Sequence, residues 1–448
     1  MTGQEKNKDR DVKLLYEDFP YPRRDPESER TRLLCTQADY LDRINHYGWR
    51  GARDFSKPVR ALVAGGGTGD ATIFLAQQLS KIGGAVAHLE ISEASMAIAR
   101  QRAEVRGLDN IEWISAPIET LPDSDLGPFD YINSMGVIHH LADPAAGLKA
   151  LADVLDPDGA MCIGVYGYYG RAPVRYTRRI LQSLGIYDAD RARQLDVTYR
   201  LLDQLPPRHP LKRSQNDEWF DMLREDPNEL QDLFLHPRER SYTVGQLYDE
   251  AEGAGLHLNS FTSFFDSGPP FKGNYTHEAA LGDPELQQLT AGLSARESAE
   301  LAELVNGRLT FHSAYMSKHP DSVASIADRD RVPFFFFRPA RAIEDMLVGE
   351  PGSRMNFRDQ DNCGIGVELY AGVREVLLAI DGRRSVGEIC DLVANSPDVA
   401  RHPNPTGYAE DLFNAVFDSL NSFDWVLLGS GSGPIHMHNA GRFDRVDS

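Results

Sequence analysis

The spacing of apolar residues changes along the chain. Between residues 60 and 165, short apolar runs alternate with helical stretches of about three turns, which is the pattern of βαβ units. The runs predict strands at residues 61–64, 85–91, 111–115, 131–134 and 161–165, with helices near 71–81, 95–106 and 144–155. Five parallel strands joined by crossover helices follow, so the predicted fold class is α/β.

The segments after these strands extend the same sheet. Residues 171–240 carry more charge and a helical period, which predicts a helical insertion overhanging the carboxyl ends of the strands. Residues 242–261 then read as a helix, a terminating glycine and a strand, and residues 309–317 read as a further strand. The result is a Rossmann-like sheet of seven strands with an antiparallel edge.

The same pattern divides the chain into parts. Residues 1–55 are polar and irregular, with a turn-rich run at 19–27, and are expected to form a lid segment over residues 56–322. Residues 335–430 are expected to form a small α+β, winged-helix-like domain. It would contain a strand at GIGVELY, a helix over 373–393 and a later helix ending in FDWVLL. Residues 431–448 read as a flexible tail.

Composition and charge narrow the class of protein. Hydrophobic residues make up 41% and charged residues 25%, as in ordinary folded proteins, and the formal net charge of −20 disfavours nucleic acid as a partner. No signal peptide or membrane span is apparent, so a cytoplasmic protein without membrane association is expected. The four cysteines lie far apart without metal-binding spacing, so neither a disulfide framework nor a metal site is expected.

A candidate cofactor site begins where the first strand meets ALVAGGGTGD. Gly65, Gly67 and Gly69 allow the backbone to turn sharply and to approach a ligand closely. The second strand ends at Glu90, whose carboxylate can accept hydrogen bonds from ribose hydroxyls. A glycine-rich turn alone can be an ordinary tight loop, but the pair indicates an adenosine-type ligand.

The spacing of the glycines separates two such ligands. In a dinucleotide-binding GxGxxG/A pattern that starts at Gly65, the last position would be Asp70, which would set a carboxylate against the pyrophosphate. The observed GxGxG spacing suits a ligand without phosphate. S-adenosylmethionine is therefore favoured over a nicotinamide cofactor.

At these residues the chain resembles class I S-adenosylmethionine-dependent methyltransferases. The resemblance extends through DYINSMGVIHHLADP and LDPDGAMCIGVY, and it is similar to bacterial enzymes with a VLHHLxDP-like loop. It implies that Gly65, Gly67 and Gly69 line the methionine and that Glu90 binds the ribose. It also implies that Ile91, Pro117 and Ile118 border the adenine, with Ser134 and Met135 near the amino-acid end. The segment SAPIETLP departs from the pattern, because it lacks the acidic residue that many relatives place against the adenine amino group.

Methyl transfer from a sulfonium needs orientation and exclusion of water, and no metal is expected. A base is required only when the acceptor atom carries a proton. His139 and His140 follow the fourth strand, where ligands of open α/β sheets bind, and are the candidate catalytic residues. The alternative is that one packs against the next helix and the other bonds a carbonyl.

Other candidates for the substrate pocket come from segments expected to close it. FLHPRERSYT also resembles a segment of bacterial methyltransferases that share a YPR-type N-terminus. For each of these residues, packing at a domain seam is the alternative. The candidates are Tyr16, Tyr21 and Arg23 near the N-terminus, Tyr166 after the fifth strand, and His236, Arg238 and Tyr242.

The C-terminal segment resembles PqqD-like modules that bind leader peptides, which implies a peptide adding as a strand beside GIGVELY. A packing or dimerisation domain, and hence a homodimer, is the alternative. Three functions follow: a methyltransferase acting on a peptide, protein or peptide-derived natural product; a small-molecule methyltransferase of secondary metabolism; and a non-catalytic cofactor-binding scaffold. The intact glycine loop and Glu90 count against the last.

Overall fold

The computed structural model describes residues 12–262, 272–336, 354–358, 364–368 and 372–431. Seven strands form one sheet in the order β3-β2-β1-β4-β5-β7-β6, in which β7 runs antiparallel to both of its neighbours. The strands are β1 (Arg60–Ala64), β2 (Ala85–Leu89), β3 (Ile111–Ile114), β4 (Phe129–Met135), β5 (Leu155–Tyr166), β6 (His257–Thr262) and β7 (Phe311–Ser317). The predicted Rossmann-like sheet of seven strands is confirmed.

Both faces of the sheet are buried, which explains why its central strands read as continuous apolar runs. Leu62 of β1 packs with the helices on one face, whereas its neighbour Val63 packs with those on the other. The first face is covered by α5 (Pro144–Val154), α11 (Val244–Gly253) and α14 (Ala295–Asn306). The second is covered by α2 (Leu41–Gly48) and α3 (Asp70–Leu79). The remaining one of the three predicted crossover helices is α4 (Glu93–Arg106), which lies between β2 and β3 in the sequence.

The N-terminal region is more regular than its sequence predicts. Residues 12–18 are helical, 3-10 helices occupy Pro26–Arg30 and Gln37–Asp39, and every residue of α2 is buried. The interpretation of residues 1–55 as irregular is therefore wrong for α2. Its polar residues are buried because they find partners far along the chain: the Arg43 guanidinium pairs with the Asp424 carboxylate at 2.5 Å, with both side chains fully buried.

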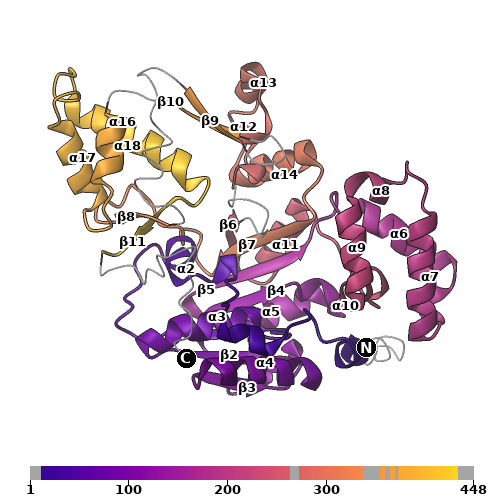
Figure 1. Ribbon diagram of the computed structural model, residues 1–448. Helices are drawn as coiled ribbons and strands as arrows, with labels where there is room; N and C mark the ends of the chain where they lie inside the picture. Colours follow the sequence, from indigo (N-terminus) through magenta and orange to yellow (C-terminus); the bar gives the residue numbers. More distant parts are fainter. Residues whose placement is uncertain (1–11, 263–271, 337–353, 359–363, 369–371, 432–448) are drawn as a thin grey trace.

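The helical insertion follows β5 and has a hydrophobic core of its own. In Figure 1 its helices gather on one side of the sheet, away from the C-terminal helices. They are α6 (Ala172–Ser183), α7 (Arg191–Gln204), α8 (Pro210–Ser214), α9 (Asp217–Glu225) and α10 (Pro227–Leu230), which continues into a π-helical turn at Gln231–Leu235. Two further short helices, α12 (His277–Ala280) and α13 (Pro284–Leu289), precede α14.

The C-terminal segment forms a second core. It contains the antiparallel pairs β9 (Arg354–Arg358) with β10 (Gly364–Glu368) and β8 (Val332–Phe335) with β11 (Val426–Gly429). Its helices are α16 (Val373–Ala379), α17 (Val386–Ala394) and α18 (Pro405–Asn421). Leu427 of β11 and Phe334 of β8 reach the core under the main sheet, so the second core is continuous with the first.

Two predicted elements in this segment are wrong in detail. The single helix over 373–393 is interrupted, because Gly382 adopts a φ of 72° and Ser385 starts α17 with a capping box to Glu388. The later helix ends at Asn421, and the run that follows forms β11 instead. The predicted tail at 431–448 lies outside the described residues except for residue 431, and the last two residues of GIGVELY also lie outside them.

No helix within the described residues is long and apolar enough to cross a bilayer.

Candidate functional site

The glycine loop follows β1 and bends away from the sheet. Gly65, Gly67 and Gly69 all have φ between 52° and 100°, a region that L side chains rarely adopt. Gly66 has a different constraint, because a Cβ there would lie 2.4 Å from the His88 ring beneath it. Glycine is therefore required along this loop, both for the backbone conformation and for the limited space.

The Glu90 carboxylate lies beside the loop, at the carboxyl end of β2. Its Oε2 accepts a hydrogen bond from the Gly67 backbone N–H at 2.9 Å, and its Oε1 accepts one from the Ser92 N–H at 2.8 Å. Burial raises the pKa of Glu90, although both backbone donors act to lower it. The carboxylate is thus held in a fixed orientation, and each oxygen keeps a further lone pair for a hydroxyl donor.

The N-terminal segment, residues 12–35, packs directly against this loop. A Cβ on Gly67 would lie 2.5 Å from the Tyr21 carbonyl oxygen. The Thr68 hydroxyl donates to the Pro22 carbonyl at 2.7 Å, and the Ser92 hydroxyl donates to the Tyr16 carbonyl at 3.0 Å. The segment therefore follows the loop from the glycines to the residues beyond Glu90.

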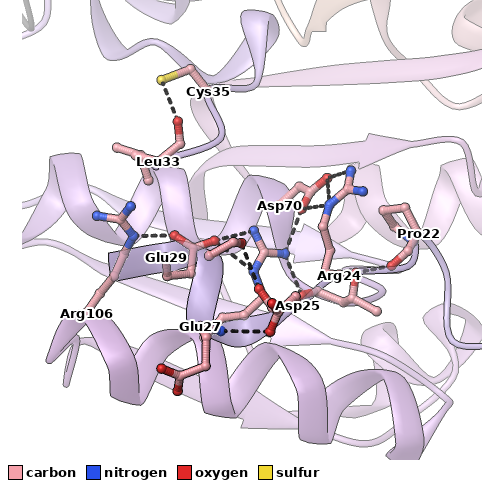
Figure 2. A network of polar contacts seen from close by, with 12 residues as sticks. Pro22, Arg24, Asp25, Glu27, Glu29, Leu33, Cys35, Asp70 and Arg106 are labelled. Atoms are coloured by element: carbon pink, nitrogen blue, oxygen red, sulfur yellow. Dashed lines mark hydrogen bonds and ion pairs between the residues drawn. The ribbon is translucent and has the colours of Figure 1, made fainter. Parts of the chain in front are cut away.

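A buried group of ion pairs holds the segment in place; we call it the anchor cluster (Figure 2). Arg102 of α4, with 1% of its side chain exposed, pairs with Glu29 at 2.7 Å and with Asp70 at 2.6 Å. Asp70 also pairs with Arg24, and Glu29 also pairs with Arg106. The Arg102 and Arg24 guanidinium groups hold the pKa of Asp70 below its ordinary value, against the effect of burial. Each charge here has an opposite partner.

A second buried polar group lies at the carboxyl ends of β4 and β5; we call it the histidine cluster. It contains His139 and His140 after β4, Tyr166 at the end of β5, and Asp232 and His236 from the insertion. The ring centroids of His139 and Tyr166 lie 3.9 Å apart, and those of His140 and His236 lie 3.7 Å apart. The structure thus brings together four residues that the sequence predicted separately.

Asp232 joins this cluster to the N-terminal segment. Its Oδ1 accepts a hydrogen bond from the Tyr16 hydroxyl at 3.1 Å, and its Oδ2 accepts one from the Tyr166 hydroxyl at 3.0 Å. The His140 Nε2 lies 4.0 Å from Oδ1. The Tyr21 hydroxyl donates to the neighbouring Glu229 at 3.4 Å, and burial, with the Asp232 charge, raises the pKa of Glu229 to about 7.

Several buried polar atoms in and beside the histidine cluster have no hydrogen-bond partner among the described residues. Both ring nitrogens of His139, the Nε2 of His236 and the hydroxyl of Ser134 at the end of β4 are of this kind. His139 is 1% exposed and Ser134 is fully buried. Because a buried polar group without a partner carries a desolvation penalty, these atoms mark a place where a ligand can supply the missing contacts.

Burial also keeps the three imidazoles uncharged. It lowers the pKa of His139 and of His236 well below the ordinary value, and the neighbouring His140 adds to the lowering in both. Burial likewise lowers the pKa of His140, while the Asp232 carboxylate opposes that effect. The histidines are therefore neutral at physiological pH and available as hydrogen-bond or proton acceptors.

The remaining predicted residues are placed as follows. Arg23 is exposed, and its backbone carbonyl accepts a hydrogen bond from Arg24 Nη1 at 2.9 Å. Ile118 is buried in the core, whereas Pro117 is exposed and Ile91 is half-buried. The Met135 sulfur accepts from the Ser313 hydroxyl at 3.9 Å. The Arg238 carbonyl lies 2.8 Å from His140 Nδ1, and the Tyr242 backbone N–H donates to the Tyr166 carbonyl at 2.7 Å.

Sequence reasoning missed Asp232, Glu229 and His88. The first two share a signal that was readable: Glu229, Asp232 and His236 follow one another at a spacing of three and four residues, which places them on one side of a helical turn. His88 gives no such signal. It lies under the glycine loop, where its Nδ1 contacts the Thr72 hydroxyl at 2.7 Å and burial lowers its pKa to about 3.

Together, this strand order, the glycine loop after β1 and an acidic residue ending β2 define the class I methyltransferase architecture. Comparison with known proteins agrees. Residues 62–161 match a family model described as a methyltransferase domain. The chain therefore contains a methyltransferase domain within a class I methyltransferase fold, whose ligand is S-adenosylmethionine.

Individual relatives differ in how much of the chain they share. An uncharacterized protein from Synechococcus sp. is 28% identical over 345 residues, covering 76% of this chain and 78% of that protein. A ubiquinone biosynthesis O-methyltransferase from Acinetobacter baumannii is 30% identical over 117 residues, covering 26% of this chain. The chain spans only 47% of the length of that enzyme.

Among solved structures, PKMT2 from Rickettsia typhi has the same fold over most of the chain. Its TM-score is 0.55 at 12% identity, covering 86% of this chain and 73% of that one. The same protein in complex with AdoHcy (S-adenosylhomocysteine) gives a TM-score of 0.55 at 14% identity, covering 87% and 75%. The likeness in fold thus extends well beyond residues 62–161.

Proposed function

We propose that the chain transfers the methyl group of S-adenosylmethionine to a nucleophilic atom of a peptide, a protein or a peptide-derived natural product. The histidine cluster carries the proposal. It places buried, unpaired polar atoms at the carboxyl ends of β4 and β5, where ligands of an open α/β sheet bind. The same face of the molecule holds the glycine loop and Glu90.

The residues present fit the cofactor. The positive-φ glycines keep the loop free of side chains, and Glu90 offers a fixed, buried carboxylate. The Tyr21 carbonyl, which lies against Gly67, would move to admit the ligand. In this proposal Gly65, Gly67 and Gly69 line the methionine part and Glu90 accepts from the ribose. Ile91, Pro117 and Ile118 border the adenine, and Ser134 and Met135 lie near the amino-acid end. When bound, the cofactor supplies a methyl group on a sulfonium, whose positive charge disappears during transfer.

The chain's own residues then orient the acceptor and receive its proton. In this proposal His140 acts as the base. Its Nδ1 lies 2.8 Å from the Arg238 carbonyl, so Nδ1 carries the hydrogen and Nε2 has a free electron pair. After Nε2 takes a proton, Asp232 stabilises the imidazolium from 4.0 Å. His139, Tyr166, Tyr16 and Tyr21 would line the acceptor, with the N-terminal segment excluding water.

A peptide or protein acceptor is favoured by the C-terminal segment. Its strands β9 and β10 form a sheet of only two strands within the described residues, and an extended chain can add to such an edge through backbone hydrogen bonds. A small-molecule acceptor is the second candidate. It is favoured by the similarity of about a quarter of the chain to ubiquinone biosynthesis O-methyltransferases.

Isotope-labelled methyl transfer separates the two candidates. The full chain is incubated with methyl-labelled S-adenosylmethionine and two acceptor pools, one of peptides encoded beside its gene and one of phenolic small molecules. We expect labelled peptides by mass spectrometry, with the rate reduced about 100-fold in His140→Gln. The exposed His257→Gln is the control and should match the parent. Label confined to the phenolic pool would overturn the peptide acceptor.

A further inference from the structure

Asp232 links separate parts of the chain through its carboxylate. It comes from the helical insertion, yet each of its carboxylate oxygens accepts a hydrogen bond from a different part of the chain. The donors are the hydroxyl of Tyr16 in the N-terminal segment and the hydroxyl of Tyr166 in β5. Its side chain is only 8% exposed. A carboxylate this buried retains its orientation because its oxygens are hydrogen-bonded.

The N-terminal partner of Asp232 belongs to the segment that covers the glycine loop. Tyr16 holds the Ser92 hydroxyl through its carbonyl, and Glu17 accepts from the first two backbone N–H groups of α4 at 2.9 and 3.0 Å. A few residues later, the Tyr21 carbonyl lies against Gly67. Residues 16–21 therefore contact the cofactor loop on one side and the insertion on the other.

These contacts have a mechanical consequence. A ligand that enters between the Tyr21 carbonyl and Gly67 displaces residues 16–21, and that displacement changes the bond from the Tyr16 hydroxyl to Asp232. Because Asp232 also holds Tyr166 and faces His140, a change at the cofactor loop reaches the acceptor residues through one carboxylate. Two binding sites joined in this way affect one another's affinity reciprocally.

We infer that Asp232 is a positioning residue that couples the glycine loop to the histidine cluster. The histidine cluster is then correctly arranged for the acceptor only when the N-terminal segment lies closed over the cofactor. This inference rests on the proposed function.

Further contacts join the N-terminal segment to the insertion. The Tyr21 hydroxyl donates to Glu229 at 3.4 Å, Asn228 donates to the Pro20 carbonyl at 2.7 Å, and the Tyr16 and His236 ring centroids lie 5.8 Å apart. His236 meets Tyr16 and His140 through ring contacts, whereas the Asp232 carboxylate hydrogen-bonds to both Tyr16 and Tyr166 and so joins the N-terminal segment, the insertion and β5.

Hydrogen–deuterium exchange of the full chain, with and without AdoHcy, tests the inference without an identified acceptor. AdoHcy should change the protection of residues 12–35 and also of residues 227–236 in the insertion. In Asp232→Asn and in Tyr16→Phe the change in 227–236 should fall by half or more, while that in 12–35 remains. Tyr16→Phe removes a single hydroxyl, so it serves even if Asp232→Asn unfolds.

Two further variants serve as controls for the exchange experiment. Asp221 lies on the exposed side of the same insertion, with 69% of its side chain exposed. Asp221→Asn should therefore leave the exchange response of residues 227–236 to AdoHcy unchanged. Asp232→Glu keeps the carboxylate and should restore part of it. If calorimetry shows AdoHcy binding but 227–236 does not respond, or responds in both variants with more than half the parent change, the coupling is wrong. Absence of AdoHcy binding would overturn the proposed function as well.

Discussion

The anchor cluster and the histidine cluster are both buried and both touch the N-terminal segment, but they are completed differently. In the anchor cluster, each carboxylate meets a guanidinium, as Arg102 does with Glu29 and Asp70. In the histidine cluster, both ring nitrogens of His139 lack a partner among the described residues. A satisfied buried network stabilises a fold, whereas an unsatisfied one is retained only if something else completes it. The anchor cluster is therefore complete as it stands, whereas the histidine cluster is the one proposed to bind a ligand.

Removing a charge from the anchor cluster should have the largest effect. Arg102→Met removes the guanidinium that Glu29 and Asp70 share and leaves them only Arg106 and Arg24, so the free energy of unfolding should fall by about 3 kcal/mol. Denaturant unfolding measures the change. Arg30→Met, which removes an exposed pair with Glu27, is the control and should unfold like the parent. An unchanged Arg102→Met would show that the cluster is not holding the segment.

The glycine loop gives the next largest effect. In Gly67→Val the side chain would collide with the Tyr21 carbonyl, and the φ of 52° adds strain. We expect AdoHcy affinity to fall by more than about 100-fold, roughly 2.7 kcal/mol. Gly253→Val has open space and no positive φ, so it should bind normally by calorimetry. Parent-like affinity in Gly67→Val would place the ligand elsewhere.

Glu90 should contribute less. Glu90→Ala removes a carboxylate that accepts two backbone hydrogen bonds, and AdoHcy binding should weaken by about 1–3 kcal/mol, the scale of a hydrogen bond to a charged group. Calorimetry on Glu104→Ala, an exposed position of α4, supplies the matched control. Equal weakening in both variants would remove Glu90 from the site.

The smallest effect concerns how the stability of the histidine cluster depends on pH. Burial lowers the pKa of His139 well below its ordinary value. Its contribution to stability is therefore present above pH ~6.5 and is lost as the pH falls, because the unfolded chain binds the proton first. Between pH 7.5 and 5.5, the free energy of unfolding of His139→Phe should fall by about 1 kcal/mol less than that of the parent, as measured by denaturant unfolding.

His257→Gln, an exposed position, should keep the parent's pH dependence. At pH 7.5, His139→Phe should be at least as stable as the parent, since a ring without a partner is replaced by an apolar one. A large loss of stability at pH 7.5 would mean that His139 is a structural residue.

The sheet could be predicted from the sequence because its physics is local. Consecutive residues of β1, such as Leu62 and Val63, are both apolar because both faces of the sheet are covered. The helix α2 could not be predicted in this way. Arg43, Asn45 and His46 read as surface residues, and only long-range contacts such as that with Asp424 make them buried. A local pattern does not reveal a partner supplied by the other end of the chain.

The residues of the candidate site also fall into those that local sequence order indicates and those that only long-range packing brings together. The glycine loop, Glu90 and the tandem histidines follow directly after strands, so their order in the sequence indicates their place in the fold. Asp232 lies in a helical insertion whose orientation no sequence spacing specifies, and its meeting with Tyr16 and Tyr166 depends on three separate segments. That the nitrogens of His139 lack partners is likewise a property of packing alone.

The most direct measurement is a crystal structure of the full chain with AdoHcy bound. The account predicts that the ribose hydroxyls bond to Glu90, that the methionine part follows the glycine loop, and that the sulfur faces the histidine cluster beneath the N-terminal segment. AdoHcy bound away from Gly67 and Glu90, or with its sulfur turned from His139 and His140, would contradict it.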